Sequence, residues 1–148
     1  MTVYRITKEE YSHQLKASGY PARWNARGSY VIYTAENRSL ACLENLVHRS
    51  GEGNNDLFKV MLIQIPDNLK MDAIEVTSLK KDWQQIENYP YCQSLSANWL
   101  TEFKTAVLKV PSVLIKNEFN YLINPAHHDF KKIKLAGVED FIFDTRFN

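Results

Sequence analysis

Residues 22–49, with the sequence ARWNARGSYVIYTAENRSLACLENLVHR, contain a strand pattern followed closely by a helix pattern. Residues 29–35 are rich in β-branched and aromatic side chains and follow Gly28, which predicts a strand. Ser39 has the residue type of a helix N-cap, Arg49 suits the last helical turn, and the loop 51–55 follows. We therefore expect a strand, a short turn and a helix in direct succession.

The predicted helix has two different lines of side chains along it. Leu40, Leu43 and Val47 recur at spacings of three and four, so we expect them to face the core. Glu44 and His48 are four residues apart and share another line along the helix. Both can therefore face one pocket.

The remainder of the chain adds more strands than helices. Strand patterns occur at residues 3–6, 57–65, 73–77, 107–115, 121–123, 133–135 and 141–144, whereas helical composition occurs at residues 83–86 and 94–102. Pro111 interrupts one strand pattern, which favours an edge position or a bulge there. Because strands and helices do not alternate regularly, we expect an α+β fold, with a mixed or antiparallel sheet flanked by helices.

Composition limits the class of protein. The 148 residues suffice for one hydrophobic core, so we expect a single domain over residues 1–148. The net charge is only +1 and no block of like charges stands out, which argues against a nucleic-acid-binding arm. The sequence has no signal-peptide pattern and no apolar stretch of about 20 residues, so we expect a cytoplasmic protein that does not insert into membranes.

Several common site motifs are absent from the sequence. There is no GxGxxG, GxxxxGK[ST], HExxH or GxSxG, and five glycines offer little for a phosphate-binding loop. Cys42 and Cys92 form no CxxC pair and have apolar neighbours, so we expect buried, inert thiols. His127, His128 and Asp129 are adjacent, so their side chains should diverge; we predict a surface turn there and no metal site.

Polar residues within apolar segments are the remaining site candidates. Arg5 lies in the first predicted strand, Tyr33 in the second, and Arg23 precedes the second. Each residue also has a structural explanation: Arg23 could pair with Glu44, and Tyr33 could be a core aromatic residue. Ser112, Glu44 and Asn124 complete the set of candidates, and Ser112 could simply be a small residue at a bulge.

Five segments, in order along the chain, resemble the RES domain, a family named for its Arg, Glu and Ser. They are Val3-Tyr4-Arg5-Ile6; Ala22-Arg23-Trp24-Asn25 with Gly28 and Val31-Ile32-Tyr33; Leu40-Ala41, Leu43-Glu44 and Val47-His48; Val110-Pro111-Ser112; and Asn120-Tyr121-Leu122-Ile123-Asn124-Pro125. The family often has Asn-Pro-x-His-Pro near the end, whereas His128 replaces the second proline here. Residues 66–93 match no family motif.

The resemblance implies a function as well as a fold. It implies an ADP-ribosyltransferase-like fold and a toxin that cleaves the nicotinamide–ribose bond of NAD+, depletes cellular NAD and acts beside an Xre-like antitoxin; it also allows a homodimer. NAD+ would be the substrate, and no separate cofactor is implied. The implied catalytic residues are Glu44, Arg23 and Ser112, and the implied NAD+ contacts are Arg5, Arg23, Tyr33, His48 and Asn124.

These residue types suit that chemistry. Breaking the bond passes through an oxocarbenium-like state, which a carboxylate such as Glu44 can stabilise. Arg23 offers donors for the pyrophosphate, Tyr33 an aromatic face for nicotinamide, and Ser112 a hydroxyl for the ribose or the attacking group. Water, phosphate or a protein side chain could each accept the ADP-ribosyl group. A protein-modifying ADP-ribosyltransferase and a non-enzymatic binding domain with a structural Arg23–Glu44 pair are the alternatives.

Overall fold

The strands form a seven-stranded sheet in the order β4-β5-β6-β2-β1-β3-β7 in the computed structural model, which describes residues 1–49 and 57–147. Only β4 and β5 pair in parallel; the other neighbours are antiparallel. This confirms the predicted α+β class with a mixed sheet. The strands are β1 (Thr2–Lys8), β2 (Ile32–Ala35), β3 (Phe58–Gln64), β4 (Met71–Ala73), β5 (Val107–Pro111), β6 (Phe119–Ile123) and β7 (Lys134–Phe141).

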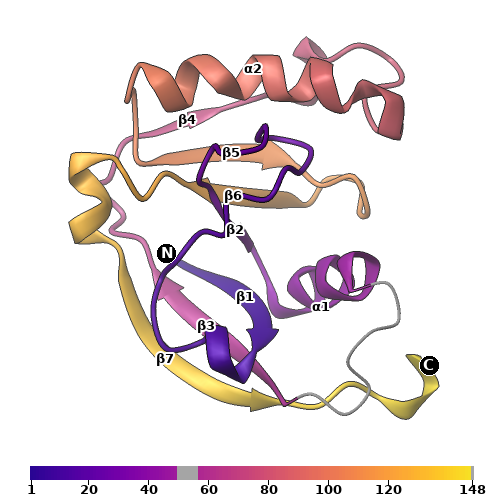
Figure 1. Cartoon of the computed structure of the whole chain (residues 1–148), viewed down its shortest axis with the longest axis vertical. Helices are drawn as coiled ribbons and strands as arrows, with labels where there is room; N and C mark the ends of the chain where they lie inside the picture. Colours follow the sequence, from indigo (N-terminus) through magenta and orange to yellow (C-terminus); the bar gives the residue numbers. More distant parts are fainter. Residues whose placement is uncertain (50–56, 148) are drawn as a thin grey trace.

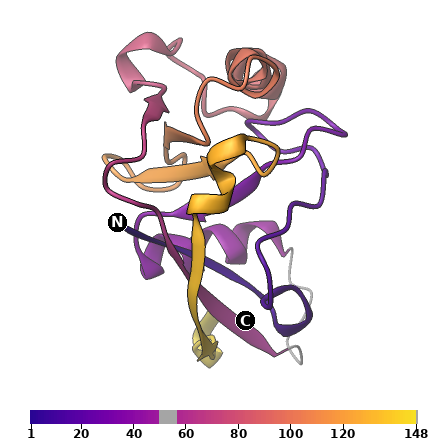
Figure 2. The same cartoon turned by 90° about the vertical axis from the view of Figure 1, so that its left-hand side faces the viewer.

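Two α-helices and several short 3₁₀ turns complete the described part of the chain. Helix α1 (Arg38–His48) lies beside β1 and β2, and α2 (Tyr89–Thr101) runs over β5 (Figure 1). Figure 2 shows α2 end-on above this part of the sheet. The 3₁₀ turns are η1 (Glu9–Tyr11), η2 (Val76–Ser78), η3 (Ile86–Asn88), η4 (His128–Lys132) and η5 (Thr145–Phe147). No helix in these residues is long and apolar enough to cross a membrane.

The sheet consists of two halves that are joined weakly in the middle. Strand β1 pairs with β3 along its whole length, from Thr2 to Lys8, but it pairs with β2 only through Tyr4 and Ala35. In Figure 1 the β5 and β6 arrows accordingly run across the page, whereas β1, β3 and β7 run diagonally below them. The divergence of β1 from β2 leaves space between the halves.

Each half of the sheet has its own apolar contacts with a helix. Trp99 and Cys92 of α2 pack with Leu108 and Leu122 of β5 and β6. On the other side, Leu40 and Ala41 of α1 pack in a cluster with Ile6, Ala35 and Val60. A third cluster includes Val3, Ile32, Met61 and Ile123 and so spans both halves. Burial of these side chains fixes α1 over the point where the halves separate.

Helix α1 differs from its prediction in its N-cap and in the burial of Val47. Its N-cap is Asn37, whose side chain accepts a hydrogen bond from the backbone N–H of Leu40, while Ser39 is exposed within the helix. Leu40 is buried and Leu43 half-buried, but Val47 is 57% exposed, so the prediction that Val47 faces the core is wrong. Val47 borders a small cavity instead. The predicted loop at residues 51–55 lies outside the described residues.

Other element boundaries also differ from the predictions. Pro111 does end β5, but β5 lies between β4 and β6 and is not an edge strand. The helix predicted from residue 94 begins earlier, at Tyr89, because Pro90 is tolerated in a first helical turn. The patterns at residues 133–135 and 141–144 overlap only the two ends of one strand, β7, and residues 142–144 lie outside it; the pairing of β7 with β3 shifts register between Leu62 and Ile63. The strand predicted at residues 73–77 is wrong except for Ala73, the last residue of β4, and the helix predicted at residues 83–86 is a turn that leads into η3.

Candidate functional site

The main cavity lies where β1 and β2 diverge, beneath α1. Its volume is about 470 Å³, and its lining includes β1 and β2, residues 18–22 of the connecting loop, and one side of α1. Its polar lining residues include Arg5, Tyr33, Glu44, Asn45, His48 and Asn120. The volume and the mixed lining are typical of a site for a polar small molecule.

A smaller cavity of about 90 Å³ lies on the other side of Glu44. Ala22, Tyr33, Glu44, His48 and Asn120 line both cavities, so the two spaces meet at these residues. The smaller cavity has a more aromatic and apolar wall, contributed by Trp24, Tyr89, Pro111, Val113 and Leu114. Glu44 is therefore a carboxylate at the junction of a larger polar space and a smaller apolar one.

Among the described residues, two side chains have polar contacts with the Glu44 carboxylate. Its Oε1 accepts a 2.7 Å hydrogen bond from Nδ2 of Asn120 on β6, and its Oε2 lies 3.5 Å from Nε2 of His48, one turn along α1. The Oδ1 atom of Asn120 is buried and has no hydrogen-bond partner among the described residues. Such an unsatisfied acceptor is uncommon in a native protein and calls for a functional or structural explanation.

Asn120 was missed as a site residue in the sequence. It belongs to the Asn120–Pro125 segment that resembles the RES family, but its amide carries no charge and nothing in the local pattern connects it to Glu44. The connection comes from the pairing of β6 with β2, which places Asn120 opposite Ala35, just before α1 begins. Only that long-range pairing brings the amide to the carboxylate.

Tyr33 forms a wall between the cavities. Its hydroxyl donates to Oδ1 of Asn25 at 2.6 Å and accepts from the backbone N–H of Trp24 at 3.1 Å. Burial raises the pKa of Tyr33 well above its usual value, so this hydroxyl stays neutral. Tyr33 thus ties β2 to the loop that carries Arg23, and its ring faces both spaces.

Arg5 places a cation at the main cavity. Its Nη1 donates to the backbone carbonyl of Lys16 at 3.0 Å, and within residues 1–49 and 57–147 no carboxylate pairs with it. Burial lowers the pKa of Arg5, yet a guanidinium remains charged at neutral pH. A half-buried guanidinium without a carboxylate partner is suited to bind an anion.

Arg23 does not form the ion pair with Glu44 that was the structural alternative to a role in the site. Its Nη1 donates to the backbone carbonyls of Trp83 at 2.7 Å and Gln85 at 3.3 Å, and its Nη2 donates to that of Gln84 at 2.7 Å. The guanidinium also lies 4.6 Å from the ring centre of Tyr89. Three successive carbonyls of one turn outcompete the carboxylate because they match the fork of guanidinium donors.

Of the three remaining site candidates, His48 lines the cavities, whereas Ser112 and Asn124 do not. Ser112 lines neither cavity; its Oγ accepts from the backbone N–H groups of Leu114 and Ile115 at 3.1 Å each and so caps the turn after β5. Asn124 also lines neither, and its Oδ1 accepts from the backbone N–H of Ala126. Nδ2 of Asn124 has no partner among the described residues. The exposed His48 lines both cavities.

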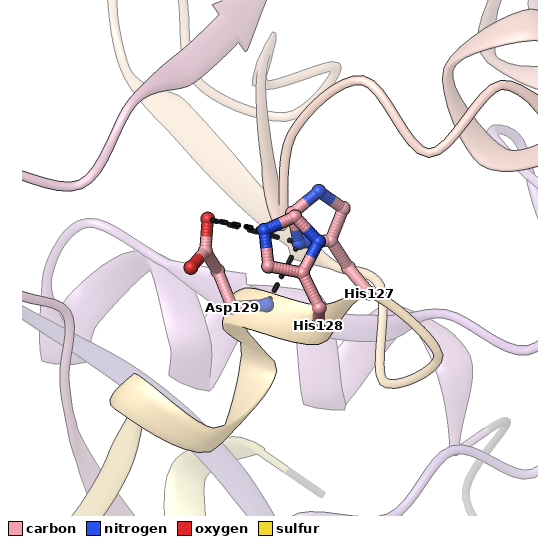
Figure 3. Close-up of side chains that lie close together, drawn as sticks. All are labelled: His127, His128 and Asp129. Carbon is pink, nitrogen blue, oxygen red and sulfur yellow. Dashed lines mark hydrogen bonds and ion pairs between the residues drawn. The ribbon is translucent and has the colours of Figure 1, made fainter.

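The His127-His128-Asp129 cluster also differs from its prediction. The two imidazoles do not diverge: they stack with ring centres 4.3 Å apart (Figure 3), and His127 is buried although His128 is exposed. Nε2 of His127 lies 3.0 Å from the carbonyl of Phe103, and its Nδ1 accepts from the backbone N–H of Asp129. Asp129 pairs with Lys132 at 2.6 Å. The His127 nitrogens therefore serve local structure and leave no lone pair aimed at a metal ion.

Fold and site together define a small α+β domain with one carboxylate between two cavities, and this domain has a solved counterpart. The chain superposes on a chain of the crystal structure of the M. tuberculosis MbcT–MbcA toxin–antitoxin complex with a TM-score of 0.77, covering 95% of this chain and 83% of that one. The sequence identity is only 15%, so this similarity establishes the fold alone.

Sequence comparison supplies the family. A protein of Sphingobium sp., the "Prs ADP-ribosylating toxin", is 36% identical over 126 residues, 84% of this chain and 78% of that protein. "Toxin Res" of Yersinia enterocolitica is 32% identical and "Toxin Res" of Photorhabdus laumondii 30%, each over 99% of this chain. These alignments cover 99% and 96% of the two proteins. The RES domain model matches residues 2–144, and the chain belongs to the RES domain family.

Proposed function

We propose that this protein is the toxin of a toxin–antitoxin system and that it breaks the nicotinamide–ribose bond of NAD+. The observation that carries the proposal is the position of Glu44, a carboxylate at the junction of the two cavities with no Lys or Arg partner among the described residues. An ionised carboxylate in a cleft is the group that this reaction needs beside the ribose. The names of the relatives agree with a toxin.

The main cavity offers suitable contacts for the larger part of NAD+. Its volume of about 470 Å³ lies in the range of ligand sites. Arg5 is the better placed guanidinium for the pyrophosphate, because Arg23 is engaged by backbone carbonyls. Glu44 then lies beside the nicotinamide ribose, and the ring of Tyr33 borders both the ribose and the nicotinamide.

Glu44 would act on the charge that develops on the sugar. As the bond from C1″ of the nicotinamide ribose to the pyridinium nitrogen breaks, its electron pair goes to nicotinamide, which leaves as a neutral molecule, and the ribose becomes oxocarbenium-like. Glu44 stabilises that positive charge, and Asn120 holds the carboxylate in one orientation. A lone pair of the acceptor then bonds to C1″. When the acceptor is water, a proton is released and ADP-ribose is the product.

Induced expression in bacteria tests the proposal. We expect intracellular NAD to fall and growth to stop after induction of the parent protein. The Glu44→Gln protein, expressed to the same soluble level, should leave NAD unchanged, because the substitution removes the negative charge and little else. Constant NAD during growth arrest by the parent would overturn NAD consumption as the activity.

Transfer to a protein acceptor is the second candidate, and the 36% identity to a protein named as an ADP-ribosylating toxin favours it. Both reactions use the same NAD+ site and differ only in the acceptor. Incubation of purified protein with NAD+ alone separates them. Rapid formation of free ADP-ribose supports hydrolysis, and phosphate-dependent formation of ADP-ribose 1″-phosphate supports phosphorolysis. Turnover that requires added bacterial protein supports transfer to a protein.

An antitoxin partner is part of the proposal. The solved structure with a similar fold is a toxin–antitoxin complex, and an enzyme that consumes NAD requires a partner that restrains it in its host. We expect an Xre-like protein to be that partner. Coexpression with an Xre-like gene adjacent to this one should restore growth and NAD. Unchanged toxicity despite soluble coexpressed protein would contradict that assignment.

A further inference from the structure

Most of the donors of the Arg23 guanidinium are used within the protein. Three backbone carbonyls, those of Trp83, Gln84 and Gln85, accept from its two terminal nitrogens, and its Cζ lies 4.6 Å from the centre of the Tyr89 ring. We infer that Arg23 is a positioning residue that acts on the substrate through Tyr89 and the wall of the smaller cavity, and that it is not a phosphate contact. This inference rests on the proposed cleavage of NAD+ and deepens it.

Three of the five N–H groups of Arg23 already donate to the carbonyls of Trp83, Gln84 and Gln85, which leaves Nε–H and one Nη2–H. Hydrogen bonds to charged groups are the stronger class, so these three bonds hold the guanidinium against the turn of residues 83–85. The guanidinium could not turn to grip a phosphate with both terminal nitrogens without losing at least one of them. Arg5 has only one such bond, to the carbonyl of Lys16, and it lines the larger cavity.

The contacts of Arg23 build the wall of the smaller cavity. Residues 83–85 precede α2, whose first residue is Tyr89, and Tyr89 lines this cavity together with Arg23 and Glu44. Trp83 also packs against Trp24, with ring centres 5.9 Å apart. We call the hydrogen bonds from Arg23 to the carbonyls of residues 83–85 the Arg23 clamp. The clamp links the loop of residues 22–25 to the segment that leads into α2. Loss of the clamp would leave the position of the Tyr89 ring relative to Glu44 poorly determined.

The chemistry of this wall suits the leaving group. Trp24, Tyr33 and Tyr89 contribute aromatic rings, while Pro111, Val113 and Leu114 contribute apolar surface. A planar aromatic group such as nicotinamide packs well in these surroundings, whereas a phosphate would lose its hydration without compensation. Since Glu44 borders the same space, a nicotinamide ring held there would place its ribose beside the carboxylate.

The decisive experiment compares NAD+ with nicotinamide riboside, which contains the same scissile bond but no phosphate. Arg23→Met should lower kcat/KM for both substrates by the same factor, about tenfold to a hundredfold, because the clamp acts on the shared part. Arg5→Met should lower kcat/KM for NAD+ by a similar factor and leave that for nicotinamide riboside unchanged. If Arg23→Met impairs only the reaction of NAD+, the inference is wrong.

A double-mutant comparison tests the route through Tyr89. If Arg23 acts by holding the Tyr89 ring, Arg23→Met combined with Tyr89→Leu should be no slower than the slower single variant. Independent effects that multiply would contradict this route. Hydrogen exchange supplies a readout that needs no activity: Arg23→Met should speed amide exchange in residues 83–89, and Arg5→Met should not.

The two proposals can fail separately. A parent protein that releases no nicotinamide from NAD+ contradicts the proposed function, while the exchange experiment still decides whether Arg23 holds the wall. Unchanged exchange at residues 83–89 in Arg23→Met overturns the positioning role whatever the activity. Both variants should be confirmed as folded by circular dichroism before either comparison.

Discussion

The amide of Asn120 and the carboxylate of Glu44 come from segments 76 residues apart, and their 2.7 Å hydrogen bond determines how the carboxylate faces the cavities. A Glu side chain on a helix has several rotamers, and one bond from a strand residue selects among them. His48 lies farther away, 3.5 Å from the other oxygen, and most of its side chain is exposed. Asn120 is therefore the main support of the carboxylate.

Substitution of Asn120 should impair turnover more than folding. Asn120→Leu removes the donor to Glu44, and Asn120→Asp keeps the shape but brings a second carboxylate to the first. We expect kcat for NAD+ cleavage to fall about tenfold or more in both, in line with the loss of one charged hydrogen bond. Steady-state assays of nicotinamide release measure the effect. Parental kcat in both folded variants would remove Asn120 from this role.

Residue spacing predicted part of the site, and long-range pairing decided the rest. The four-residue spacing of Glu44 and His48 placed both at one pocket, and Tyr33 preceded them in the adjoining strand. The partner of Arg23 could not be predicted, because the accepting carbonyls lie about 60 residues away and backbone groups leave no trace in a sequence. The sequence did not indicate that Oγ of Ser112 caps the turn after β5, and the catalytic role implied for Ser112 stays a prediction.

At the scale of elements, the first turn of α1 orients the helix that carries Glu44. Oδ1 of Asn37 accepts from the backbone N–H of Leu40 at 2.8 Å, which satisfies one of the free donors at the helix start. Nδ2 of Asn37 also donates to Glu118 at 3.2 Å and so links α1 to the turn before β6. Ser39, the N-cap that the sequence pattern predicted, is exposed inside the helix.

A matched pair of substitutions tests this cap. Asn37→Ala should lower the free energy of unfolding by about 1 kcal/mol, the usual cost of losing an N-cap. Ser39→Ala should change it by less than about 0.5 kcal/mol, as is usual for exposed positions. Urea unfolding followed by circular dichroism measures both. A larger loss in Ser39→Ala than in Asn37→Ala would mean that the helix begins where the sequence pattern suggested.

Helix and strand ends proved the least predictable feature of the elements. The pattern at residues 57–65 predicted β3 within a residue or two at either end, because its apolar run is long and β-rich. In contrast, β7 continues through Gly137, a residue type that usually marks a break, because β3 pairs with it on either side of the glycine. Pairing partners that lie far away in sequence override such local signals.

At the scale of the whole molecule, α2 covers one half of the sheet, and the burial of Cys92 depends on that packing. Cys92 is fully buried among Trp24, Trp99 and Leu108, as predicted, whereas Cys42 on α1 is only half-buried, so the prediction of a buried thiol is wrong for Cys42. Burial raises the pKa of both thiols above the usual value, so both carry less thiolate at neutral pH than an exposed cysteine. The two thiols therefore differ mainly in how accessible they are to a reagent in solution.

A thiol reagent should therefore modify the two cysteines at different rates. In the native protein we expect Cys42 to react first and Cys92 only when α2 separates from the sheet. Both rates should increase as pH rises toward the raised thiol pKa, because the thiolate is the reactive form. Mass spectrometry of peptides after timed labelling gives the two rates. Equal rates in native protein would show that α2 does not protect Cys92.

The sequence predicted the fold class, but it did not predict the order of the strands in the sheet. The excess of strands over helices indicated an α+β domain, but the sequence did not indicate that β1 would meet β2 at only one residue pair, Tyr4 with Ala35. That weak junction creates the main cavity, because the halves of the sheet diverge there. The cleft is thus a property of the whole molecule that no single segment reveals.

Nicotinamide release from NAD+ by purified protein tests the central claim most directly. We predict steady release by the parent, and a rate lower by about a hundredfold or more in folded Glu44→Gln, because the variant lacks the negative charge that stabilises the oxocarbenium-like state. Equal rates in the two proteins would contradict the role of Glu44. Absence of nicotinamide release by the folded parent, with and without phosphate or bacterial protein as acceptor, would contradict the proposed activity itself.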